Sequence, residues 1–343
     1  MKKNILYIVS LLALASCTSN EVIENPTPVY GTDEIKLNGG VITEGPATRA
    51  ILTDVATGGM DISILRQDAV SATLPADFSV GTEKTAYVCD GATVVDGATP
   101  AKGAVVFGTK SAVTHEYYLA NGDNSRLFAW YPQTTAGKVS YTGGNVTFQL
   151  DGYTDVMASK AVEGNKASAS RIGNIELKHM LTQLQFKAYE AAEGGKVQWG
   201  KIKKIEVLGL DPTCVVALDI NKANAPAATY SGTPATLQVK KADGTALGDV
   251  EVEAFDTSDA ITKAKATSCG AILIPHRAAR AAVLKIKVYT DGNTAGQELS
   301  LDNTIAYDQS GSYVVYLKYT SQEITPTVSI SAWTNGGSQD IEM

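Results

Sequence analysis

The chain has 343 residues, with 29 lysines and arginines against 36 aspartates and glutamates. This negative balance argues against nucleic acid, or an anionic membrane surface, as a partner. Four cysteines without a CxxC pair exclude a disulfide framework, so the fold depends on hydrophobic cores. The length is enough for two domains.

The N-terminus has the pattern of a secretory signal peptide. Two lysines follow Met1, and an almost unbroken apolar stretch runs over residues 5–15. It is shorter than the roughly 20 residues that a membrane-spanning helix needs. The stretch ends in Leu-Ala-Ser-Cys, which resembles the bacterial lipobox and predicts a lipid anchor, such as palmitate, on Cys17. The alternative is a plain signal peptide with a chance cysteine.

Past the leader, short segments alternate between apolar and polar residues. In residues 145–150, Val146, Phe148 and Leu150 share one face of a strand. Residues 181–189, 284–290, 312–320 and 325–333 follow the same period of two. Such alternation, with Asn-Gly, Gly-Gly and Asp-Gly pairs between segments, is typical of antiparallel strands with one solvated face. We therefore predict an all-β chain built from antiparallel β-sandwiches.

The segment 160–171 is small, polar and poor in strand formers, which makes it the predicted domain break. With Cys17 acylated, Cys89, Cys214 and Cys269 remain, and they can form one disulfide at most. The predicted organisation is a signal peptide (1–16), a tether with a removable strand (17–49), an N-terminal sandwich (50–168) and a C-terminal sandwich (169–343).

Nothing in the sequence indicates catalysis, a metal or a cofactor. His115, His179 and His276 are isolated in sequence, and no HExxH or GxSxG motif occurs. We expect no catalytic residue, no metal ligand and no enzymatic activity, and we expect His179 to lie at a strand edge or domain seam.

Aromatic residues are concentrated between Glu116 and Pro132. One interpretation is a stacking platform for a glycan around Tyr117 and Tyr118. The other is a hairpin whose second strand, residues 127–131, is buried on both faces, and the continuous apolar run favours it.

The segment between tether and body combines a strand with an exposed loop. Ile35 and Leu37 alternate as in a strand, and Val41 follows a glycine pair. Pro46 then favours an extended loop, the shape that proteases bind. Because Arg49 is the one basic residue between Lys36 and Arg66, a trypsin-like protease would cut between Arg49 and Ala50.

Several motifs in this order resemble the fimbrillin family of Bacteroidales. They are the lipobox, a strand followed by ATRA, RLFAWYP, DVMASK, LKHMLTQLQFKAY, AILIPH and VSISAWTNGG. The resemblance implies two transthyretin-like sandwich domains in a pilin of the type V pilus. It also implies export as an outer membrane lipoprotein, cleavage after Arg49 by an arginine-specific surface protease, and transfer to a fimbria at the cell surface.

Loss of Ile35, Leu37 and Val41 would open a groove, and β-strand addition by another pilin subunit would fill it. The candidate donor residues are Val328, Ile330 and Ala332, with Ile341 next. The alternative function is a lipoprotein that stays anchored and binds glycan or host protein without polymerising. The sequence leaves the adhesion ligand, a host or bacterial surface molecule, unidentified.

Overall fold

The structure is a computed structural model that describes residues 28–42, 51–52, 58–257, 263–278 and 281–331. Strands dominate these ranges, with short helical turns at α1 (Gly195–Trp199) and η1 (Ser168–Ser170). The all-β prediction is confirmed, whereas the transthyretin-like detail stays a prediction. In the described part of the chain, no helix is long and apolar enough to cross a membrane.

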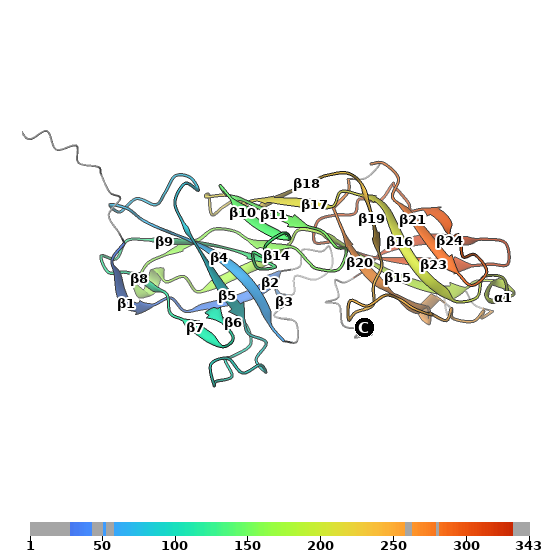
Figure 1. Ribbon diagram of the computed structural model, residues 1–343, viewed down its shortest axis with the longest axis horizontal. Helices are drawn as coiled ribbons and strands as arrows, with labels where there is room; N and C mark the ends of the chain where they lie inside the picture. The colour runs from blue at the N-terminus through green and yellow to red at the C-terminus, as the bar shows by residue number, and fades with distance from the viewer. Residues whose placement is uncertain (1–27, 43–50, 53–57, 258–262, 279–280, 332–343) are drawn as a thin grey trace, which may run out of the picture.

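The strands form an elongated molecule with two bodies and a sheet between them (Figure 1). The N-terminal body contains β1 (Tyr30–Glu34), β2 (Leu37–Ile42), β3 (Ile51–Leu52), β4 (Met60–Asp68), β5 (Thr82–Val88), β6 (Ala104–Thr109), β7 (Ala112–Thr114), β8 (Tyr117–Leu119), β9 (Ser125–Tyr131), β12 (Met157–Ser159), β13 (Val162–Gly164) and β14 (Asn174–His179). The bridging sheet contains β10 (Val139–Thr142), β11 (Asn145–Gln149), β17 (Thr213–Ala217) and β18 (Ala227–Ser231). The C-terminal sandwich contains β15 (Thr182–Glu190), β16 (Ile202–Leu210), β19 (Ala235–Gln238), β20 (Thr267–Ile274), β21 (Lys285–Thr290), β22 (Gln297–Ser300), β23 (Ser312–Tyr319) and β24 (Ile324–Ser331).

The main sheet of the N-terminal body closes on itself. Its order runs β2-β14-β12-β9-β4-β5-β6, and β2 also pairs with β6. The ring encloses one apolar core, which includes Ile62, Val88 and Leu177. A closed sheet has no free edge along the ring, so every strand in it is bonded on both sides.

The central strand β9 is buried on both faces. Leu127 and Ala129 face the core inside the ring, whereas Phe128 and Trp130 pack under the bridging sheet against Phe148 and other residues. The core-strand interpretation of residues 127–131 is therefore confirmed, and the continuous apolar run is explained by burial on two sides.

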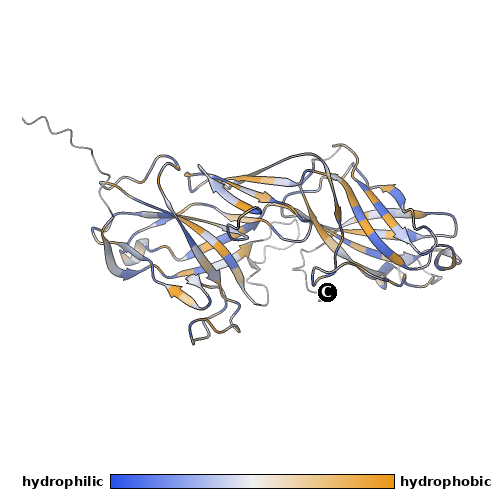
Figure 2. Cartoon of the chain, viewed as in Figure 1, coloured by the Kyte–Doolittle hydropathy of each residue, from blue (hydrophilic) through white to orange (hydrophobic). Residues whose placement is uncertain are grey.

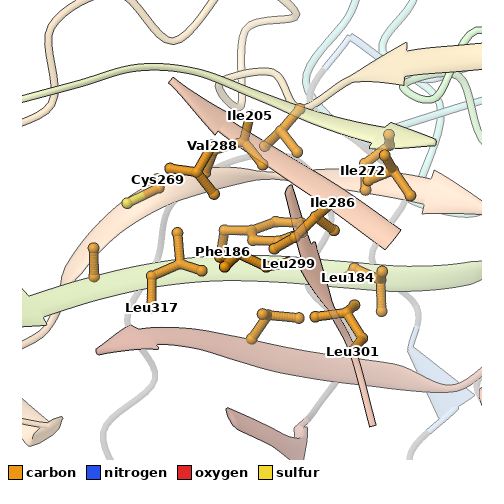
Figure 3. Close-up of a cluster of buried hydrophobic side chains, with 14 of the residues drawn as sticks. Leu184, Phe186, Ile205, Cys269, Ile272, Ile286, Val288, Leu299, Leu301 and Leu317 are labelled. Carbon is orange, nitrogen blue, oxygen red and sulfur yellow. The ribbon is translucent and has the colours of Figure 1, made fainter. Parts of the chain in front are cut away.

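The C-terminal sandwich consists of two facing sheets, ordered β20-β15-β23-β24 and β19-β16-β21-β22. Hydrophobic and hydrophilic residues alternate along its strands (Figure 2), as one buried face per sheet requires. Phe186 lies in the middle of its core, with Ile286 and Leu317 nearby (Figure 3). This core is drawn from residues 184–328.

The predicted domain boundary at residue 168/169 does not coincide with the change of sheet. β14 follows that boundary but pairs with β12 and β2 in the N-terminal body. β17 and β18 pair with each other and with β11 in the bridging sheet. The chain passes from one body to the other between His179 and Thr182, because β14 ends and β15 begins there. Strand pairing, which brings together residues distant in sequence, decides this division.

His179 lies at that crossing, and its side chain is 1% exposed. Its ring Nδ1 pairs with the carboxylate of Asp155, and Ser310 Oγ donates to its backbone carbonyl at 2.7 Å. The histidine therefore ties the end of β14 to the turn before β23 of the C-terminal sandwich, at the seam where the sequence placed it.

Cys89, Cys214 and Cys269 are free thiols in three separate apolar clusters. Burial raises the pKa of both Cys214 and Cys269 to about 12. A thiol that stays protonated and enclosed is inert, so these cysteines act as small core residues.

Candidate functional site

The segment ahead of Arg49 supplies two strands of the N-terminal body. Cys17, Arg49 and Ala50 lie outside the described residues. Their neighbours do not: β2 and β3 form an antiparallel pair, and the residues that join them contain Arg49 and Ala50. The expected cleavage site is therefore in the connection of a hairpin, with one arm on each side of the cut.

β2 is bonded on both sides. It runs parallel to β14, with Asn38 opposite Asn174, and antiparallel to β6, with Leu37 opposite Val105. The amide of Asn38 donates to the carbonyl of Gly173 at 2.8 Å, and the amide of Gly39 donates to the carbonyl of Gly103 at 2.6 Å. β2 thus closes the ring, and its removal would leave β14 and β6 with unpaired edges.

The predicted strand residues Ile35, Leu37 and Val41 are each 3% exposed. They lie in the core inside the ring. Leu37 and Val41 belong to β2, whereas Ile35 sits in the two-residue connection after β1, where its amide donates to the carbonyl of Glu116 at 2.7 Å. All three side chains enter one core, as their spacing by even numbers of residues predicts.

The glycine pair of β2 has two different environments. A Cβ added at Gly39 would lie 3.0 Å from Val105 Cγ2 and 3.1 Å from Val88 Cγ1. A Cβ added at Gly40 would meet nothing within 4 Å. Gly39 therefore faces the core at a constriction between the positions of Leu37 and Val41, and Gly40 faces open space.

β1 pairs with β8 and contributes charged contacts at its end. Asp33 pairs with Arg171 at 2.8 Å, and Glu34 pairs with His115 Nδ1 at 2.7 Å. These side chains are between one-third and three-fifths exposed. Exposed pairs of this kind contribute about 0.2–1 kcal/mol each, so they position β1 more than they stabilise it.

Sequence reasoning missed a buried ionic cluster beneath β1. Arg66 pairs with Asp68 and with Glu116, each at 2.9 Å, and its side chain is 2% exposed. The ring of Tyr30 covers the guanidinium at 4.6 Å, and the Tyr30 hydroxyl donates to Asp68 at 3.0 Å. Burial, together with Asp68, raises the pKa of Tyr30. The alternation of apolar and polar residues in β4 does not predict this cluster. Burial of the Arg66 charge is favourable only with its acidic partners beside it, and Glu116 comes from a distant part of the sequence.

The donor candidates lie at the other end of the chain. β24 is an edge strand that pairs with β23, with Val328 opposite Val315. Val328 packs, partly buried, on the core of the C-terminal sandwich, whereas Ile330 is 64% exposed. Ala332 and Ile341 lie outside the described residues. The strand is thus held firmly at Ile324, which is 1% exposed, and loosely at Ile330.

The glycan platform is not formed at Tyr118. Its ring is 1% exposed inside the N-terminal core, and its hydroxyl accepts a hydrogen bond from the amide of Ile172 at 2.7 Å. Tyr117 is half-buried in β8. Among the described residues, no group of His, Cys, Asp and Glu is arranged to hold a metal ion.

A sequence model of fimbrillin-like proteins matches residues 48–333. The chain belongs to the fimbrillin-like family. The resemblance found in the sequence is thereby confirmed. The matched region begins after β1 and β2.

Two solved structures with TM-scores above 0.5 share the fold of this fimbrillin-like protein. A candidate cell adhesion protein from Bacteroides uniformis has 13% identity and a TM-score of 0.53, over 88% of this chain and 99% of that chain. A second, from Bacteroides ovatus, has 13% identity and a TM-score of 0.54, over 89% and 99%. The tip fimbrial protein Mfa3 from Porphyromonas gingivalis, truncated at its C-terminus, has 8% identity and a TM-score of 0.40, over 88% and 100%. No curated protein matches.

Proposed function

We propose that this fimbrillin-like protein is a structural subunit, a stalk or tip pilin, of a fimbria that supports adhesion. It is exported as a lipoprotein on Cys17, cleaved after Arg49 at the cell surface, and assembled by strand exchange. Its work is structural, and no catalytic step is part of it. The candidate adhesion proteins that share its fold support the adhesive role.

The observation that carries the proposal is the position of β2. It precedes Arg49, yet it closes the main sheet of the N-terminal body between β14 and β6. A strand at such a place is ordinarily permanent. Cleavage after Arg49 would separate β2 from the rest of the chain. The sheet would then stay closed only while the chain is intact.

Removal of the segment with β2 would expose apolar core surface and leave backbone hydrogen-bonding groups unpaired, so a replacement strand would be strongly stabilised. Burial of Ile35, Leu37 and Val41, each 3% exposed, contributes about 1.5–3 kcal/mol per side chain. The backbone groups that β2 satisfies on β14 and β6 lose their partners as well. A strand from a second subunit restores both contributions, because its backbone completes the ladders and its alternate side chains fill the core.

The donor in this proposal is the C-terminal segment with Val328, Ile330 and Ala332. A chain that gives its C-terminus and receives another at its N-terminal body makes a heterologous contact that does not close on itself. Such contacts produce a filament. The partners are therefore other pilin subunits, the arginine-specific protease and, at the finished fimbria, a surface ligand.

The test is the N-terminus of the protein recovered from the native cell surface, measured by mass spectrometry. A chain beginning at Ala50 is expected, and Arg49→Ala should abolish both this product and the polymer. Lys36→Ala is the matched control, because Lys36 is a basic residue in the same segment with an 82% exposed side chain. A wild-type chain that still begins at acylated Cys17 would favour the anchored binding lipoprotein instead.

A further inference from the structure

The strand that leaves has a distinctive size pattern on its inner face. Ile35 and Leu37 are large, Gly39 has no side chain, and Val41 is β-branched. A replacement strand must fit the same sequence of spaces, because the walls belong to β6, β14 and other strands that remain. The pattern to match is large, large, small, β-branched at alternate positions.

The position of Gly39 restricts most strongly which side chain a replacement strand can place there. Val105 and Val88 approach Gly39 so closely that a single methyl group there would already lie 3.0 Å and 3.1 Å from their side chains. An alanine at this position would therefore require the valine side chains to shift by a few tenths of an ångström. A larger side chain overpacks the site, and overpacking is destabilising. The groove thus accepts glycine or alanine at this point and rejects the rest.

One stretch of the C-terminal segment carries this pattern. Between residues 319 and 343, large, large, small and β-branched residues follow at alternate positions once only, from Val328 to Thr334. We propose that residues 328–334 of a second copy replace residues 35–41, running in the same direction, with Ala332 at the constriction. This inference rests on the proposed function and fixes its register. The pairs are Val328 for Ile35, Ile330 for Leu37, Ala332 for Gly39 and Thr334 for Val41.

The outer face agrees with this register. The position of Gly40, where a Cβ would meet nothing within 4 Å, receives Trp333, the largest side chain of the segment. The exposed position of Asn38 receives Ser331. The same direction also retains a parallel ladder to β14 and an antiparallel ladder to β6, as β2 has them.

Three alternative registers place a residue larger than alanine at the constriction. If Val328 is moved forward to the position of Leu37, Ile330 falls at Gly39. If the strand is reversed with Val328 at Val41, Ile330 again falls at Gly39. If Ile341 takes the position of Val41, Gln339 falls there. Each of these side chains is larger than the space beside Val105 and Val88 admits.

The donor subunit can release this stretch while the start of β24 stays attached. Ile324, 1% exposed, holds the start of the strand in its own core. Val328 is partly buried and Ile330 is 64% exposed, so the end of the strand gives up little burial when it leaves β23. In the groove, Ile330 would take the place of Leu37, which is 3% exposed. The exchange therefore gains buried apolar area.

The experiment compares two leucine substitutions in the full chain, cleaved after Arg49 and followed by polymer formation in light scattering. Ala332→Leu should reduce the rate of polymer formation about tenfold or more, because it overpacks the constriction. Ser331→Leu, the matched control at the neighbouring outward position, should stay within about twofold. Ala332→Gly should polymerise like wild type.

A compensating variant tests the site itself. Val105→Ala removes the methyl group nearest to the constriction, so Ala332→Leu combined with Val105→Ala should recover most of the polymer. Polymerisation of Ala332→Leu at the wild-type rate would overturn the register and leave strand exchange standing. Lack of rescue by Val105→Ala, in a variant whose circular dichroism is native, would also overturn it. Failure of the cleaved wild-type chain to polymerise would instead contradict the proposed function.

Discussion

Leu37 in the N-terminal body and Phe186 in the C-terminal sandwich are both buried, but their strands reach the two cores by different routes. β15, which carries Phe186, pairs with β20 and β23 within residues 182–319. β2, which carries Leu37, pairs with β6 and with β14, whose residues 174–179 come much later in the chain. The C-terminal core is built from residues close together in the chain, whereas the N-terminal core needs β2, which lies ahead of the predicted cleavage site at Arg49.

The difference shows that one kind of sequence pattern can build two cores whose strands are connected differently along the chain. Both regions alternate apolar and polar residues, and both bury the apolar face. What separates them is connectivity: the closing strand of the N-terminal body is joined to the rest through the residues that contain Arg49. Under the proposed function, cleavage after Arg49 would leave the C-terminal sandwich intact and open the N-terminal body for assembly.

The largest expected effect is in the C-terminal sandwich. Phe186→Ala should lower the free energy of unfolding by about 3–5 kcal/mol, because a fully buried ring leaves a cavity. Urea denaturation should give the same loss before and after cleavage at Arg49. A loss that depends on cleavage would break the comparison, since it would couple this core to the N-terminal strands.

Leu37→Ala should lower the free energy of unfolding of the uncleaved chain by about 2–5 kcal/mol. Asn38→Ala, at the exposed neighbouring position, should change it by less than about 0.5 kcal/mol. Hydrogen exchange should locate the effect in β6 and β14, with β15 and β23 unchanged. Equal exchange rates in β6 and β14 for both variants would contradict the role of β2 as the strand that closes the ring.

Tyr30→Phe sharpens the comparison within the segment ahead of Arg49. It removes the hydrogen bond from the Tyr30 hydroxyl to Asp68 but keeps the ring over Arg66. We expect a loss of about 0.5–1.5 kcal/mol in the uncleaved chain, measured by urea denaturation. The polymer should be unaffected, because Tyr30 is absent from the cleaved subunit; a weakened polymer would mean that the segment is retained.

The smallest expected effect concerns Asp90, in the turn after β5. The Asp90 carboxylate accepts hydrogen bonds from the amides of Thr93, Ala92 and Gly58, which hold its pKa well below its usual range. A carboxyl whose pKa is lower in the folded than in the unfolded state stabilises the fold above the unfolded pKa of about 3.9. This contribution is lost as the pH falls from there toward the folded pKa. Asp90→Asn should flatten the decline in melting temperature below about pH 4, and an unchanged decline would contradict this anchor.

Much of the fold was predictable because alternation is a local property. The strands at residues 145–149, 182–190, 285–290, 312–319 and 324–331 stand where the pattern placed them. The inward positions of Ile35, Leu37 and Val41 were predictable for the same reason, since a period of two fixes the face of a strand. Family membership also followed from short motifs in a fixed order.

Pairing between distant segments was not predictable from the sequence. It decides which sheet each strand joins and which side chains meet in the core. Nothing in residues 213–231 indicates that β17 and β18 belong to the bridging sheet, because a strand does not encode its partner locally. The ionic cluster around Arg66 and the constriction at Gly39 likewise appear only when several strands meet. The sequence by itself determined the strands, their inward faces and the basic residue after them. The tertiary structure alone decided that β2 closes a ring, because closure depends on β6 and β14 lying on either side of it.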